Sequence, residues 1–105
     1  MVLYELMFAY NGELTKEEIE KELEKFKEIV EKGNGEIIKI DNLGVKKFAY
    51  PIKKKYSGYY FIAYLRAEYS LVQEISRIFK INENLFRYMF VKLDPKKFEQ
   101  KSDSE

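Results

Sequence analysis

Residues 36–67, EIIKIDNLGVKKFAYPIKKKYSGYYFIAYLRA, contain two runs of β-forming residues with no helical pattern between them. The first run, residues 36–52, is expected to form one strand with a bulge at residues 41–44, although a tight turn there would divide it into two strands. Residues 53–58 are expected to be a loop, and residues 59–67 the next strand. Pro51 lacks an amide donor, so the first strand is expected at an edge of the sheet.

Helical patterns lie on both sides of this central segment. Thr15 and Glu18 have the spacing of a capping box, and apolar residues then recur at helical spacing to predict a helix over residues 15–32. The sequence Gly33-Asn34-Gly35 is expected to end it. Ser70 and Gln73 suggest a second capping box, followed by a helix whose apolar face is formed by Leu71, Ile75, Ile78 and Phe79.

The two ends of the folded region are rich in β-forming residues. Residues 3–10 and 86–93 are expected to be the first and last strands. The order strand, helix, strand, strand, helix, strand predicts an α+β, ferredoxin-like βαββαβ fold, with two helices on one face of a four-stranded antiparallel sheet. We expect a single domain over residues 1–94. Residues 95–105 are polar and are expected to be a disordered tail.

The face of the sheet that the helices leave uncovered is the expected functional surface. Alternation places Tyr60, Ile62, Tyr64 and Arg66 on it, and Phe61, Ala63, Leu65 and Ala67 on the covered face. In the first and last strands the same reasoning turns Glu5, Met7, Arg87, Met89 and Val91 outward. So apolar a surface is expected to be covered by a partner, although some of these side chains could be ordinary half-buried sheet residues.

Residues 44–60 concentrate positive charge and aromatic rings. They contain five lysines, four tyrosines and one phenylalanine but no carboxylate, in a chain whose net charge is only +1. Cations beside flat rings suit phosphates and bases, so nucleic acid is the expected partner of a surface that includes Lys53 and Lys54. The alternative is an ordinary solvated loop or an edge protected by lysines.

The composition excludes several other classes of protein. No cysteine and no histidine are present, so disulfides, thiolate metal sites and the usual general base are absent. Without a histidine to activate a serine and without an obvious pair of carboxylates, we expect no enzyme and no cofactor. No signal peptide or membrane span is evident, which favours a cytoplasmic protein. Residues 57–64 match an RNA-recognition signature only in part.

Four segments together carry a resemblance to a known family. They are Tyr4-Glu5, residues 43–52 (LGVKKFAYPI), Gly58-Tyr59-Tyr60 and residues 82–92 (NENLFRYMFVK). In these segments the chain resembles bacterial small-subunit ribosomal protein number six, in register from residue 3 to residue 92. The Leu-Gly-x-basic-basic-x-Ala-Tyr-Pro-Ile run is long and fairly specific, and it far outweighs the partial match to the RNA-recognition signature.

The resemblance implies a ferredoxin-like protein of the ribosome that binds the central domain of 16S ribosomal RNA. In that family it does so as a heterodimer with small-subunit ribosomal protein number eighteen. The positions that match the family's binding residues are Tyr4, Lys46, Lys47, Tyr50, Tyr60, Arg87, Met89 and Lys92. With Lys53, Lys54 and Tyr64, they form the expected surface for RNA or partner protein.

Two other classes of function stay open from the residues alone. A small-ligand regulatory domain of the same fold would need a pocket, and a pure protein-interaction module would bind without sensitivity to salt. The expected mechanism is instead neutralisation of phosphates by lysines and bidentate contacts from Arg87, with recognition of RNA shape.

Overall fold

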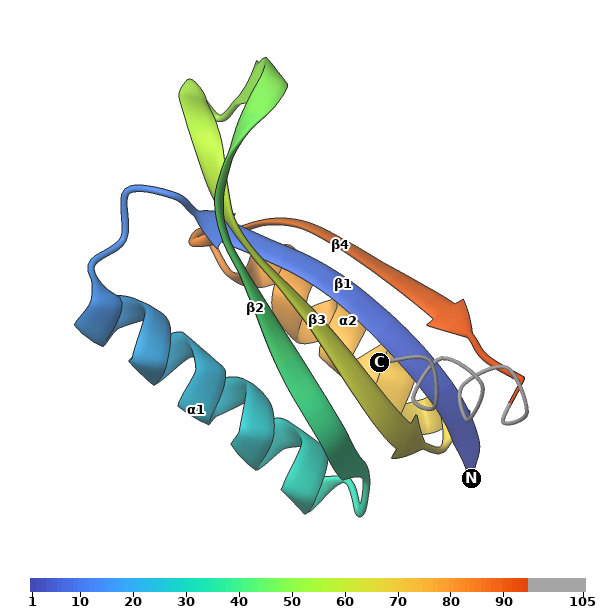
Figure 1. Cartoon of the computed structure of the whole chain (residues 1–105). Helices are drawn as coiled ribbons and strands as arrows, with labels where there is room; N and C mark the ends of the chain where they lie inside the picture. Colours follow the sequence, from blue (N-terminus) through green and yellow to red (C-terminus); the bar gives the residue numbers. More distant parts are fainter. Residues whose placement is uncertain (95–105) are drawn as a thin grey trace.

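The computed structural model describes residues 1–94, and the predicted tail lies outside the described residues. The elements are β1 (Val2–Asn11), α1 (Lys16–Lys32), β2 (Glu36–Ile52), β3 (Lys55–Ala67), α2 (Tyr69–Ile81) and β4 (Leu85–Lys92). The strands form one antiparallel sheet in the order β2-β3-β1-β4, and both helices cover the same face (Figure 1). The predicted ferredoxin-like arrangement is confirmed.

The core lies between the covered face and the helices. Phe8 is fully buried at its centre, where its ring contacts those of Phe26 from α1, Phe61 from β3 and Phe79 from α2. The alternation predicted for β3 is correct, because the four residues assigned to the covered face, Phe61, Ala63, Leu65 and Ala67, are all buried. Ring stacking therefore joins both helices to the two central strands.

The first helix begins as predicted and the second does not. The Thr15 hydroxyl accepts a hydrogen bond from the Glu18 amide at 3.2 Å, and the Glu18 carboxylate accepts one from the Thr15 amide at 3.0 Å. At α2 the predicted Ser70–Gln73 box is wrong. Pairing of β3 with β1 continues to Ala67, so the helix starts directly after Glu68, whose side chain makes no capping hydrogen bond.

The hairpin of β2 and β3 is longer than predicted. β2 is one edge strand with three register shifts, which confirms the bulged strand, but the loop expected over residues 53–58 is wrong. Only Lys53 and Lys54 form the turn, both in the left-handed region at φ 50° and 65°, and pairing resumes at Lys55. Because β1 ends opposite Gly58, the tip of the hairpin projects beyond the rest of the sheet (Figure 1).

Candidate nucleic-acid and partner interface

The uncovered face is built from rows of residues that pair across the strands. Ile62, Met7 and Met89 form one row across β3, β1 and β4, and Tyr64, Glu5 and Val91 form the next. Paired residues in a sheet project from the same face, so both rows point away from the helices. The sequence alternation predicted these positions.

An apolar strip crosses β3, β1 and β4 on this face. Met7 and Ile62 are half-buried, while Met89 is 52% exposed and Val91 is also exposed. Glu5 lies beside the strip on β1, and Asp41 pairs with Ile62 from β2. An exposed apolar strip of this kind is suited to a protein partner that presents apolar side chains.

The two tyrosines expected on this face have different surroundings. The Tyr64 ring is only 9% exposed, and the Lys39 ammonium group lies over it, 5.3 Å from the ring centroid. Lys39 also pairs with Asp41 at 3.7 Å, which keeps the cation over the ring. Tyr60, half-buried near the hairpin, contacts the edge of Phe48 at a centroid separation of 6.2 Å. Neither ring is a freely exposed platform for stacking.

Tyr4 and Lys92 do not belong to the uncovered face. They pair with each other across β1 and β4, in a row whose other member is Leu65 on the covered side. Tyr4 is 8% exposed and packs edge-on against Phe90 at 6.1 Å, so its expected role as a surface contact is corrected to a core role. Lys92 is exposed at the end of edge strand β4.

The end of the β2–β3 hairpin, residues 45–57, carries most of the positive charge of the candidate surface, and residues 47–57 project beyond the end of β1. We call residues 45–57 the lysine hairpin. Lys46 and Lys47 lie opposite Gly58 and Ser57, so their side chains leave from opposite faces. Tyr50 is 82% exposed. Arg87 on β4 is exposed and pairs with Ala9, in the row that also contains Tyr60.

The five lysines of this segment divide into two groups. Lys55 forms an ion pair with Glu13 at 2.6 Å, and the Lys53 ammonium group donates a hydrogen bond to the Glu83 carbonyl at 3.3 Å. Within residues 1–94, the side chains of Lys46, Lys47 and Lys54 form no ion pair or hydrogen bond. These three cations are therefore available to an external anion.

Sequence reasoning missed two aromatic residues in this region. Tyr56 is an exposed ring on the lysine hairpin, two residues after Lys54. Phe86 lies at the start of β4, where Phe48 contacts it at a centroid separation of 6.3 Å. The composition of residues 44–60 contained a signal for Tyr56. Nothing local in the sequence indicated that Phe86 would meet the hairpin.

The described part of the chain offers neither an acidic metal site nor a membrane-spanning helix. Among residues 1–94, no group of three or more acidic side chains is arranged to hold a metal ion. None of the helices over the same residues is long and apolar enough to cross a membrane.

Comparisons with known proteins agree with the architecture. The family model described as Ribosomal protein S6 matches residues 3–92. Small ribosomal subunit protein bS6 of Helicobacter acinonychis is 40% identical over 94 residues, which is 90% of this chain but 66%, just under two thirds, of that relative. The bS6 protein of Nitratiruptor is 39% identical over 94 residues, covering 90% of this chain and 73% of the relative.

A solved structure is similar over nearly the whole length. The crystal structure of 30S ribosomal protein S6 from Thermotoga maritima has a TM-score of 0.84 and 28% sequence identity, with 99% of this chain and 98% of that chain covered. Both the sequence match and the fold match include the β2–β3 hairpin and β4. The chain therefore belongs to the ribosomal protein S6 family.

Proposed function

We propose that this chain is a structural constituent of the small ribosomal subunit in the cytoplasm. It binds the central domain of 16S ribosomal RNA together with small-subunit ribosomal protein number eighteen, and so supports subunit assembly and translation. Membership of the S6 family supports this assignment and does not favour the small-ligand or pure protein-interaction alternatives. The chain is not an enzyme and needs no cofactor.

The observation that carries the RNA-binding part is the set of unpaired cations on the lysine hairpin. Lys47 and Lys54 lie beyond the end of β1, and Lys46 lies level with its last residue, so a phosphate backbone can approach them without clashing with the body of the protein. Each lysine that neutralises a phosphate releases condensed counterions, so binding depends on salt. Exposed Arg87, at the same end of the uncovered face, adds a bidentate donor.

The apolar strip fits the partner protein better than it fits RNA. Met7, Ile62 and Met89 offer no hydrogen bonds to phosphate or sugar. Burying this strip against an apolar protein face leaves the lysine hairpin free for the RNA. The partner then supplies much of the specificity, because three phosphate contacts alone give weak, sequence-independent binding.

The test is binding of the protein to a fragment of the 16S central domain, with and without protein number eighteen, over a series of salt concentrations. We expect tight and salt-dependent binding only with the partner present. Absence of binding in both cases, at low salt, would refute the proposal. Binding that does not respond to salt would exclude the lysine hairpin as its source.

A further inference from the structure

The lysine hairpin touches the body of the protein at the α2–β4 turn, residues 82–84. Lys53, the first residue of the hairpin turn, donates to the Glu83 carbonyl at 3.3 Å, and its ammonium group lies 5.5 Å from the centroid of the Phe86 ring. The hydrogen bond to the carbonyl and the cation–π contact both join the Lys53 ammonium group to other residues of the protein. Lys53 therefore differs from Lys54, its neighbour in the same turn.

Phe48 makes a second contact between the hairpin and the same part of β4. Its ring contacts Phe86 at 6.3 Å and Tyr60 at 6.2 Å between centroids. It also fills the space beside Gly58, where an added Cβ would lie 2.6 Å from the Phe48 ring. Phe86 is thus held between Phe48 at the base of the hairpin and Lys53 at its tip.

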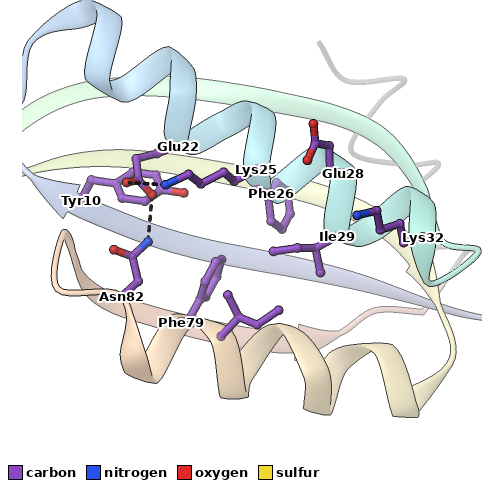
Figure 2. Close-up of a pocket in the computed structure, with 10 residues that line it drawn as sticks. Tyr10, Glu22, Lys25, Phe26, Glu28, Ile29, Lys32, Phe79 and Asn82 are labelled. Atoms are coloured by element: carbon purple, nitrogen blue, oxygen red, sulfur yellow. Dashed lines mark hydrogen bonds and ion pairs between the residues drawn. The ribbon is translucent and has the colours of Figure 1, made fainter.

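The α2–β4 turn is itself fixed from the helix side by a buried carboxylate. Glu22 of α1 is 7% exposed and is the only buried charged residue in the described part of the chain. It accepts a hydrogen bond from the side-chain amide of Asn82 at 2.8 Å (Figure 2). It accepts another from the side-chain amide of Asn84 at 3.2 Å. Lys25 lies 4.0 Å away at the rim of the helix pair. A buried carboxylate is tolerated because these donors replace water.

The turn has little freedom once these bonds are made. The backbone amide of Asn84 donates a hydrogen bond to the side-chain oxygen of Asn82 at 2.9 Å. The backbone amide of Asn11, in β1, donates one to the backbone carbonyl of Asn84 at 2.8 Å. Burial raises the pKa of Tyr10, and the nearby Glu22 carboxylate raises it further, so this neighbour stays neutral. The Glu83 carbonyl is consequently presented to Lys53 from a rigid support.

We propose that Lys53 is a positioning residue that fixes the direction of the lysine hairpin by docking on Glu83 and Phe86, and that Glu22 holds the turn on which it docks. Within the lysine hairpin, phosphate binding is then left to Lys46, Lys47 and Lys54. The effect on RNA affinity rests on the proposed function. The effect on the orientation of the hairpin does not, because it belongs to the free protein.

The matched variants are Lys53→Met and Lys54→Met, which remove the same charge from adjacent residues and keep most of the aliphatic chain. In the complex with protein number eighteen and the RNA fragment, Lys54→Met should lower the slope of log K against log salt by about one unit. Lys53→Met should leave that slope unchanged and weaken binding about threefold to tenfold at every salt concentration, because a mobile hairpin must be ordered on binding.

Backbone NMR on the free protein supplies the second measurement. Heteronuclear NOE values and residual dipolar couplings over residues 45–57 should show a more mobile hairpin in Lys53→Met and an unchanged one in Lys54→Met. Lys53→Arg should restore order, because a guanidinium can also donate to the carbonyl and stack on the ring. Glu22→Gln should speed amide exchange in residues 82–85 and loosen the hairpin without altering the salt slope.

The outcomes separate the two proposals. Equal losses of salt slope in the Lys53 and Lys54 variants, with equal hairpin order, would overturn the positioning role. A wild-type protein that fails to bind RNA with its partner would instead refute the proposed function. The NMR comparison would still decide the role of Lys53.

Discussion

Single residues of the lysine hairpin have different chemical environments although they look alike in the sequence. Lys53 and Lys55 are used within the protein, on Glu83 and Glu13, whereas Lys46 and Lys47 have no side-chain partner among residues 1–94. Counterion release counts only the cations that reach phosphate. The number of lysines in the segment therefore overestimates its effective charge toward RNA.

Replacing both Lys46 and Lys47 by alanine should lower the slope of log K against log salt by about two units, since two phosphate contacts are lost. The measurement is a fluorescence or filter-binding titration of the ternary complex across a range of salt concentrations. Lys27→Ala with Lys32→Ala is the control, because both lysines are exposed on α1 in the second half of the helix, away from the end whose preceding loop contacts the hairpin. An unchanged slope in the hairpin variant would mean that Lys46 and Lys47 do not contact phosphate and only protect the edge strand from pairing with other chains.

The apolar strip makes a separate prediction about the partner protein. Met89→Glu places a charge beside Met7 in the strip, so binding of protein number eighteen should weaken at least about tenfold through the cost of burying a carboxylate. Isothermal titration calorimetry of the two proteins measures this. Since Met89 is exposed, the melting temperature should change little. Unaltered affinity would place the partner elsewhere.

The sequence misassigned Tyr4 for an instructive reason. Period-two alternation turns Glu5 and Met7 outward, which by itself turns Tyr4 toward the helices, where the structure buries it. Its inclusion in the surface came from its match to a family position, which contains no information on which side of the sheet it lies. Tyr64 lies on the uncovered face, as the alternation predicted. Its ring is covered by the Lys39 side chain from the neighbouring strand, and residue spacing in the sequence does not reveal such a contact.

Among the elements, α1 depends on the capping box at its first turn. Thr15→Ala should lower the free energy of unfolding by about 1 kcal/mol, because the hydroxyl that accepts from the Glu18 amide is lost. Urea denaturation measures the change, and Thr15→Ser should retain most of the stability. A loss as large in the serine variant would mean that the methyl group, and not the cap, is responsible.

The same cap predicts a dependence on pH. The hydrogen bond from the Thr15 backbone amide, followed by that from its side chain, lowers the pKa of Glu18 from its ordinary value of 4.5. A carboxylate with a lowered folded pKa contributes stability above the unfolded pKa, and loses it as the pH falls through the folded value. Melting temperatures measured from pH 7 into acid should therefore converge for wild type and Glu18→Gln as the pH falls through the lowered folded pKa of Glu18. A constant difference would contradict this.

Element boundaries were predictable where local chemistry sets them. The Thr15–Glu18 box and the bulged β2 strand follow from short-range rules. The hairpin turn was missed because Lys53 and Lys54 adopt the left-handed conformation that turns usually reserve for glycine or asparagine. The long pairing of β2 with β3 compensates for this conformation, and such tertiary compensation is not visible in local propensity.

At the scale of the whole molecule, charge is separated although the net charge is only +1. Residues 16–32 contain seven glutamates and five lysines, whereas the lysine hairpin at one end of the sheet contains no carboxylate. Such a distribution orients a protein on a polyanion with the hairpin leading and α1 turned away. The sequence predicted this polarity and the uncovered face. It could not predict that Phe86 and the turn before β4 would brace the hairpin, because they lie about thirty residues away along the chain.

The central claim is that the lysine hairpin meets the 16S central domain once protein number eighteen is bound. The most direct measurement is photo-cross-linking from a benzophenone amino acid at position 50, which is 82% exposed on the hairpin, compared with position 27 on α1. The account predicts cross-links to central-domain RNA from position 50, only with the partner present, and none from position 27. Cross-links from position 27 together with none from position 50 would contradict it.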